Sequence, residues 1–121
     1  SGRKSNNVHI RGVLHTVNPI AFRRYNVYKQ NSREYTLLHT KNFGDAVQIE
    51  VGAMMVGKIQ NHHGKCHFVR GQEKGMFLFG GSTIILLCDK DAVEIDETFF
   101  TNTDNNKETI VKMGQVLGKK R

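Results

Sequence analysis

Apolar residues along this chain alternate with polar ones at a period near two, or gather in short runs. Neither arrangement continues long enough for an amphipathic helix of ordinary length. Short segments of this kind predict β-strands. The segments are 8–14, 25–28, 35–38, 46–51, 54–59, 76–79, 84–88 and 93–95.

Turn-forming residues separate these segments, at 17–19, 30–32, 42–45, 61–64 and 70–72. Strands at this spacing predict a mainly β fold of two packed antiparallel sheets, arranged as a sandwich or a barrel. The helical candidate is a short turn over 97–101, for which Asp96 supplies an N-cap.

Length and composition fit a single domain. The chain has 121 residues and a mass of 13.7 kDa, and it contains 12 Gly, 1 Pro and no Trp. This size favours one core, and the glycine content is typical of many turns. We expect the domain over 8–118, after a disordered lead or tag remnant at 1–7 and before a basic tail at 119–121.

Two further features limit the class of protein. The longest uncharged apolar run, 76–88, is shorter than the roughly 20 residues that cross a bilayer, so it predicts no transmembrane segment. Cys66 and Cys88 are too few for a disulfide framework and favour a reducing compartment. The apolar run around Cys88 predicts a buried thiol.

The net charge of +7 suggests an anionic partner. Residues 1–60 carry 9 basic and 3 acidic side chains, whereas 61–121 carry 9 and 8. Solvated strand faces and loop tips would explain part of this excess. A nucleic acid would require aromatic residues on a basic face, and Tyr25, Tyr28 and Tyr35 form the one such cluster. A lipid surface is therefore the better-supported partner.

The segment with the most unusual composition is FLFGGSTIILL at 77–87, where two apolar runs meet at Gly-Gly-Ser-Thr. Two adjacent glycines allow backbone conformations that other residues avoid, and the residues after Ser82 are β-branched and predicted to be buried and rigid. This arrangement suits an N→O acyl shift, in which the Ser82 oxygen attacks the Gly81 carbonyl. The alternative is a β-bulge or tight turn between two core strands.

Read with its surroundings, this segment resembles the phosphatidylserine decarboxylase family over about residues 8–118. Several blocks in the order of the family carry the resemblance. They are GVLHTVNP at 12–19, QNSRE at 30–34, FG at 43–44, VGAMMVG at 51–57, KGMFLFGGST at 74–83 and ETIVKMG at 108–114.

The resemblance implies self-cleavage between Gly81 and Ser82, which gives a β chain up to 81 and an α chain from 82. Ser82 would become a covalent pyruvoyl group, the cofactor of the enzyme. Its carbonyl would form a Schiff base with the amine of phosphatidylserine, and loss of CO2 would give phosphatidylethanolamine.

The resemblance also implies partners and a location. An anionic phospholipid surface, the α and β chains of the cleaved protein, and a homo-oligomer are expected, with no nucleic acid. We expect peripheral association with a membrane, either a bacterial inner membrane or an organelle membrane.

The chain departs from the family in one respect. Family members carry a His-x-x-His segment and a more distant Asp upstream of this region, whereas residues 1–7 contain no His and no Asp. The chain is a fragment, a natural short form, or one in which another His acts as base. We expect slow or absent self-processing in these 121 residues alone. The six histidines are expected to be surface or strand-face residues: His9, His15, His39, His62, His63 and His67.

Two alternatives complete the sequence-based predictions. HHGKCH at 62–67 contains zinc-ligand residue types at poor spacing, so a polar hairpin tip without a metal is expected there. A non-catalytic lipid-binding or interaction module of the same fold, or a decarboxylase of another amino acid, remains an alternative function.

Overall fold

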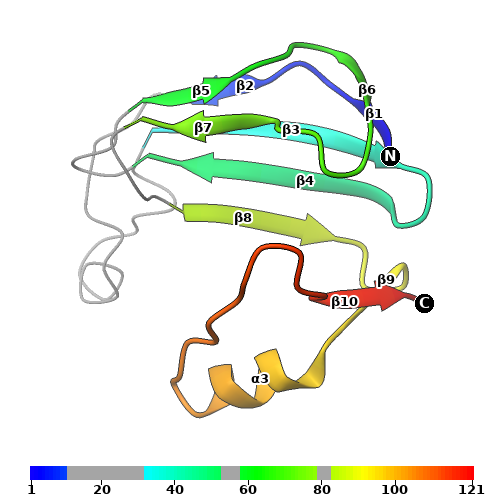
Figure 1. Ribbon diagram of the computed structural model, residues 1–121, viewed down its shortest axis with the longest axis vertical. Helices are drawn as coiled ribbons and strands as arrows, with labels where there is room; N and C mark the ends of the chain where they lie inside the picture. Colours follow the sequence, from blue (N-terminus) through cyan, green and yellow to red (C-terminus); the bar gives the residue numbers. More distant parts are fainter. Residues whose placement is uncertain (11–31, 53–57, 79–82) are drawn as a thin grey trace.

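The computed structural model describes residues 1–10, 32–52, 58–78 and 83–121 (Figure 1). These residues form short strands and one helix. The elements are β1 (Gly2–Lys4), β2 (Val8–Ile10), β3 (Arg33–Thr40), β4 (Gly44–Val51), β5 (Ile59–Asn61), β6 (Cys66–Phe68), β7 (Gly75–Phe77), β8 (Thr83–Cys88), β9 (Val93–Ile95), α3 (Glu97–Asp104) and β10 (Gly118–Lys120).

The largest sheet has the strand order β6-β1-β3-β4-β8, and every pair in it is antiparallel. β2 also pairs with β3, so β1 and β2 share one edge of that strand. Ser5 lies between them and continues the pairing, because its backbone N–H donates to Leu37 and its hydroxyl accepts from the Leu37 N–H. The long β3–β4 hairpin is the centre of this sheet.

The two faces of the sheet differ in polarity because neighbouring residues of a strand point to opposite faces. Glu34, Thr36 and Leu38 of β3 pair with Glu50, Gln48 and Ala46 of β4. The other face carries the apolar residues of β4, together with their partners in β3. These are Val47, Ile49, Val51, Leu37 and Tyr35.

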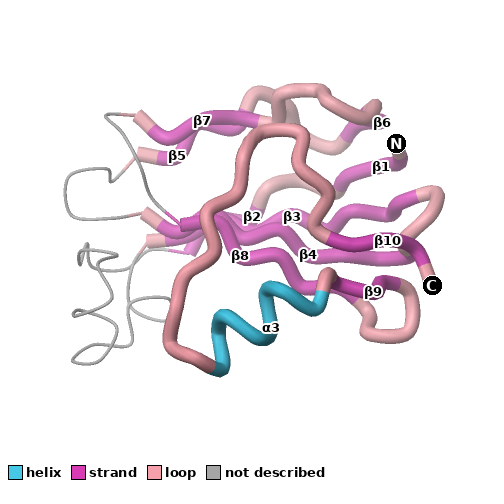
Figure 2. The backbone as a smooth tube through the Cα atoms, turned by 60° about the horizontal axis from the view of Figure 1, so that its bottom comes forward, coloured by secondary structure: helices cyan, strands magenta, loops and turns pink. Residues whose placement is uncertain are grey.

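Two smaller antiparallel pairs complete the fold. β5 and β7 form a ribbon, and polar contacts from Asn61 and Lys74 join it to the face that carries Glu34 and Glu50. β9 pairs with β10, and α3 lies between them in the chain. Figure 2 shows α3 and the β9–β10 pair near the β8 edge of the large sheet.

The main sequence-based prediction, a mainly β antiparallel fold with a short helix, is confirmed. The described strands form no closed barrel. Asp96 is the N-cap of α3, which continues three residues beyond the predicted turn. Predicted strands at 25–28 and most of 54–59 lie outside the described residues. None of the described helical segments has the length and apolar character needed to cross a bilayer.

Two segments that the sequence-based bounds placed outside the domain contribute strands. Gly2–Lys4 form a strand because β3 and β6 offer backbone partners on both sides. Gly2 also allows a close approach to β3, since a Cβ at this position would lie 2.1 Å from the His39 carbonyl oxygen. The basic tail likewise contributes a strand, because Gly118–Lys120 pair with Val93–Ile95.

The expected burial of the segment 84–88 was wrong. Ile84 is 58% exposed and Leu87 is 54% exposed, and the Cys88 thiol is exposed rather than buried. Among the described strands, β8 pairs only with β4, so it is an edge of the sheet. An edge strand has fewer neighbours that could cover its side chains.

Candidate functional site

The predicted reactive pair, Gly81 and Ser82, lies outside the described residues. The structure does describe the residue that follows in the chain, Thr83, which begins β8. Thr83 pairs with Val51 of β4, whose side chain is 1% exposed. One peptide bond therefore separates Ser82 from a strand residue that is held against a buried neighbour.

Residues that flank the other sequence motifs lie at the same end of the large sheet as Thr83. Ile10 pairs with Arg33, Arg33 with Val51, and Val51 with Thr83, in one line across four strands. The Gly52 N–H also donates to the Ser32 carbonyl, at 2.8 Å. This end of the large sheet is visible in Figure 1, where β3, β4 and β8 meet the undescribed segments. The sheet thus brings the ends of four motif-bearing segments together.

A polar cluster lies on the face of the sheet that the β5–β7 ribbon contacts. Asn61 and Lys74 of the ribbon region reach Glu34 and Glu50 of the sheet, and Asn7 joins the group from the segment between β1 and β2. We call this set the buried polar cluster. It comprises Lys4, Asn7, Glu34, Thr36, Glu50, Asn61 and Lys74.

Glu50 is the central acid of this cluster. It is 6% exposed, and its Oε1 accepts a hydrogen bond from Lys74 Nζ in a buried ion pair. Its Oε2 is buried and has no hydrogen-bond partner among the described residues. Glu50 pairs with Ile84, two residues after Ser82 in the chain, so the cluster adjoins the predicted reactive segment.

Lys74 connects the ribbon to the sheet. Besides Glu50, its ammonium group donates to Asn61 Oδ1 at 2.6 Å, and the Asn61 amide donates to Glu34 Oε1 at 3.2 Å. A buried charge is tolerated when it is paired and hydrogen-bonded in this way. The cluster therefore holds the ribbon at a defined place on the sheet.

Lys4 is the second buried cation. It is 4% exposed, and its Nζ donates to Asn7 Oδ1 at 3.2 Å and more weakly to the Ser5 carbonyl. Burial and the nearby Lys74 ammonium lower the pKa of Lys4, since both disfavour a second positive charge there. The sequence-based interpretation placed such residues on solvated strand faces or loop tips, and for Lys4 the structure corrects it.

The described histidines lie on exposed parts of strands and loops, as expected. His9 is 4.0 Å from Glu34, His39 is 2.8 Å from Asp45, and His62 is 3.4 Å from Glu73. His15 lies outside the described residues. Within the described ranges, no group of three His, Cys, Asp or Glu side chains gathers as a metal site. His67 and Cys66 belong to β6, so the expected hairpin tip is partly strand.

Sequence reasoning predicted a role for Ser82, which lies outside the described residues, and missed the buried polar cluster. A signal was present, because Glu50 interrupts the otherwise apolar end of β4 and Glu34 and Thr36 follow each other at period two. Those positions alone do not reveal which face is covered, because the covering ribbon follows in the chain only at 58–78.

Comparison with known proteins agrees with these features. The sequence profile of the family described as phosphatidylserine decarboxylase matches residues 1–119. The chain therefore belongs to the phosphatidylserine decarboxylase family.

Individual relatives support the same assignment. Phosphatidylserine decarboxylase proenzyme 2 of Clostridium acetobutylicum is 51% identical over 109 residues, which cover 90% of this chain and 37% of that protein. The phosphatidylserine decarboxylase proenzyme of Clostridium botulinum strain Langeland is 39% identical over 123 residues, covering 100% of this chain and 42% of that protein. The chain thus spans about two fifths of these relatives. No solved structure matches the chain.

Proposed function

We propose that the protein containing this chain decarboxylates phosphatidylserine, with a pyruvoyl group formed from Ser82. The observation that carries the proposal is the family match over 1–119 together with the paired line from Ile10 to Thr83. That line brings residues at the ends of the motif-bearing segments together at one end of the sheet, next in the chain to the predicted reactive serine.

Self-cleavage follows from the chemistry of the Gly-Ser bond. The Ser82 oxygen attacks the Gly81 carbonyl, which forms an ester and breaks the amide. Elimination then removes the Ser82 Cα proton, breaks the Cβ–O bond and releases the Gly81 carboxylate, leaving dehydroalanine at the start of the new chain. Its imine tautomer takes up water and releases ammonia, which gives the pyruvoyl group. β8 supports this reaction by fixing the position of the next residue, Thr83, through its ladder with β4.

The residues of this chain fit a pyruvoyl cofactor. Position 82 supplies the hydroxyl precursor, and the paired strand behind it limits the movement of the new chain end. A pyruvoyl group supplies a carbonyl that accepts the electrons released when a bound amino acid loses CO2. The chain itself contributes the rigid attachment point, and the buried polar cluster keeps the adjoining face of the sheet in place.

The proposed site of action of the protein is a membrane surface. In the segment between α3 and β10, Ile110 is 89% exposed, Val116 is 70% exposed and Met113 is fully exposed. Lysines lie in and beside this segment: Lys107, Lys112, Lys119 and Lys120. Apolar side chains flanked by lysines are the composition of segments that bind the interface of anionic membranes. Peripheral association is therefore part of the proposal.

Mass spectrometry and an activity assay of the full-length protein test the catalytic proposal. We expect two pieces that divide between residues 81 and 82, with the smaller piece blocked at its first residue. We also expect CO2 release from vesicles of phosphatidylserine. Ser82→Ala should abolish both, whereas the matched control Thr101→Ala, on an exposed part of α3, should change neither.

An intact wild-type chain without CO2 release would contradict the enzymatic proposal. If that protein still bound phosphatidylserine vesicles, the result would instead support the non-catalytic lipid-binding alternative. The homo-oligomer that the resemblance implies stays a prediction, and sedimentation velocity of the full-length protein measures it directly.

A further inference from the structure

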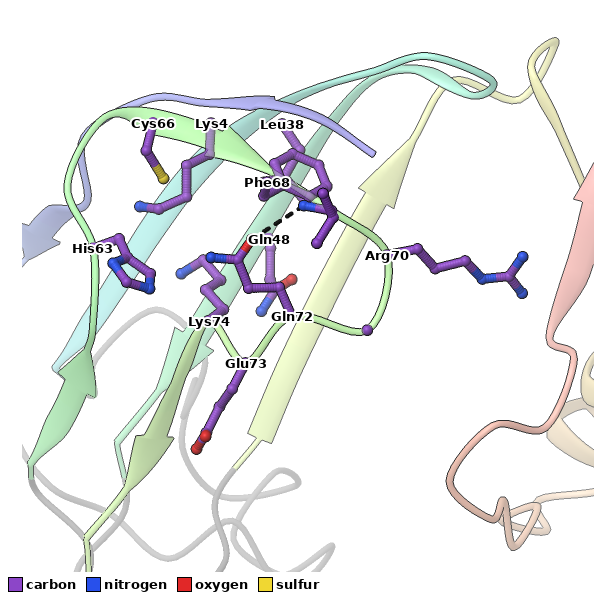
Figure 3. Close-up of a pocket in the computed structure, with 12 residues that line it drawn as sticks. Lys4, Leu38, Gln48, His63, Cys66, Phe68, Arg70, Gln72, Glu73 and Lys74 are labelled. Carbon is purple, nitrogen blue, oxygen red and sulfur yellow. Dashed lines mark hydrogen bonds between the residues drawn. The ribbon is translucent and has the colours of Figure 1, made fainter.

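A small pocket lies on the polar face of the sheet. Its volume is about 180 Å³, and it lies between Lys4, Leu38 and Gln48 of the sheet and the stretch from Cys66 to Lys74. One water molecule occupies about 30 Å³ in the liquid, so the pocket has room for a small polyatomic ion with some solvent. Leu38 and Phe68 form an apolar part of the wall (Figure 3).

Part of the pocket lies along β8 from the predicted reactive segment. Gln48 in its lining pairs with Leu86, three residues along β8 from Thr83. At about 3.3 Å per residue, that separation along the strand is roughly 10 Å.

Lys4 brings a buried positive charge to the pocket. Its Nζ donates hydrogen bonds to two neutral oxygens, from Asn7 and Ser5. Among the described residues no carboxylate forms an ion pair with it. Buried charges are normally paired, because an isolated one loses the stabilisation that water provides. A buried lysine that lines a cavity without a carboxylate partner indicates a place for an anion.

A second cation and further donors face the same space. Lys74 Nζ also contacts Asn7 Oδ1, at 3.5 Å, so the two ammonium groups share one neutral acceptor. In Figure 3 the Lys4 and Lys74 ammonium groups and the His63 ring point toward one another. Gln48 adds an amide to the lining. Several N–H donors from separate elements thus surround one site.

Among the described residues, the nearby acids do not serve as the ion-pair partner of Lys4. Glu50 is already paired with Lys74, and Glu34 accepts from Asn61. Glu73 contributes to the lining, but in Figure 3 its carboxylate points away from Lys4, and it lies 3.4 Å from His62. Glu50 and Glu34 still favour the charged form of Lys4 at longer range, but burial and the Lys74 ammonium outweigh them and lower the pKa of Lys4.

We propose that this pocket binds a small anion of the phosphate class through Lys4 and Lys74. Lysine ammonium groups are common phosphate ligands, and two of them match the multiple negative oxygens of a phosphate better than a single carboxylate would. The apolar wall of Leu38 and Phe68 leaves space for the carbon part of a phosphate ester. The shared chemistry is a phosphate group, whether free or esterified in a lipid headgroup.

Bound phosphate should raise the pKa of Lys4 toward its ordinary value, because an opposite charge favours the protonated amine. NMR of the full-length protein with labelled lysine follows the Lys4 side chain while inorganic phosphate is added. The same titration with glycerophosphoserine identifies whether an ester binds better. Sodium chloride at equal ionic strength measures the general salt effect.

Calorimetry with two variants completes the test. Lys4→Met should weaken phosphate binding about tenfold or more, because a charged hydrogen bond in a buried site is lost. Lys65→Met removes a charge from an exposed neighbouring residue outside the lining and should change binding less than about twofold. If Lys4→Met does not fold, the NMR titration of the wild-type protein still decides the matter.

The NMR titrations and the calorimetry have distinct possible outcomes. Stronger binding of glycerophosphoserine supports a headgroup site, and equal or weaker binding supports a site for free phosphate; both agree with the proposal. Lys4 signals that respond to phosphate no more than to chloride would overturn it, as would unchanged affinity in Lys4→Met. Ser82→Ala and the CO2 assay test the decarboxylase proposal separately, so failure of one proposal can be told from failure of the other.

Discussion

At the scale of single residues, two opposing effects act on the stability of the buried Glu50–Lys74 pair. Removing both charges from water is costly, and their mutual attraction and the Asn61 contact offset that cost. The side chains are 8% and 16% exposed, so solvent screens the pair only weakly. The two charges therefore depend on each other more than an exposed pair would.

This dependence predicts a strong non-additivity. Glu50→Leu alone leaves the Lys74 ammonium buried without its partner, and we expect a loss of about 3–5 kcal/mol in the free energy of unfolding. Lys74→Met alone should have a similar effect. The double variant should lose less than either single variant, because it removes both buried charges. Urea denaturation of the full-length protein measures all three.

The exposed pair of Lys119 and Glu94 provides the matched control. Its side chains are 75% and 50% exposed, so the corresponding cycle should give a coupling of about 0.2–1 kcal/mol. Simple additivity of the Glu50 and Lys74 effects would contradict the interpretation of a mutually dependent buried pair.

The residues of the site were predictable in part. The prediction for Gly81 and Ser82 rests on their residue types and order alone, and it stays a prediction because both lie outside the described residues. Lys4 and Glu50 carry no such pattern, because their importance depends on burial. That burial arises when residues 58–78 fold back over strands that lie far away in the chain, a contact that local periodicity does not contain.

At the scale of elements, helix α3 depends on a short N-terminal cap. Asp96 Oδ1 accepts a hydrogen bond from the Thr98 N–H at 2.9 Å. The backbone and side-chain hydrogen bonds from Thr98 lower the pKa of Asp96 below its ordinary 3.8, because they favour the charged carboxylate. The helix has eight residues and none of them is buried, so its end groups matter for its stability.

A pH dependence follows from the lowered pKa of Asp96. The stabilisation is fully present above about pH 3.8 and is lost as the pH falls through the lower folded-state value. The protection of the Thr98 and Phe99 amides against exchange, relative to an unfolded peptide at the same pH, should therefore fall at acid pH in the wild-type protein. Asp96→Ala should show low protection at every pH, since it lacks the cap acceptor.

Two variants complete this comparison. Asp96→Asn keeps an acceptor and should lose the pH dependence, while Asp104→Asn, at the other end of α3, should retain it. Loss of the pH dependence in Asp104→Asn, or its persistence in Asp96→Asn, would assign the effect to another acid.

Element prediction succeeded where the local pattern is complete. The alternation in β3 and β4, the turn with Gly44 at φ +66° and the cap of α3 are all local features. β1 and β10 were missed because their residues are polar and basic, and each is held as a strand by backbone partners. Those partners, β3 and β6 for β1 and β9 for β10, are distant in sequence.

At the scale of the whole molecule, the apolar surface is unevenly distributed. Among the described residues the buried apolar side chains are Ala46 and Val51, whereas the segment from Ile110 to Leu117 exposes several large ones. That segment follows α3, near the β8 side of the sheet (Figure 2). Single exposed apolar residues are ordinary, but a contiguous group beside lysines is typical of a binding surface.

Membrane binding through this segment predicts a specific response to substitution. Burying a methionine side chain contributes about 1.5–3 kcal/mol, so Met113→Ser should weaken binding to phosphatidylserine vesicles about tenfold or more. Lys112→Gln should weaken it several-fold, since a lysine near an anionic surface contributes about 1 kcal/mol, and this effect should fade at high salt. Vesicle flotation of the full-length protein, with phosphatidylcholine vesicles for comparison, measures both.

Val8→Ser replaces an apolar residue of similar character in β2, 42% exposed and distant in the chain, and should leave binding unchanged. Equal losses in Met113→Ser and Val8→Ser would mean that general apolar exposure, rather than the 110–117 segment, contacts the lipid.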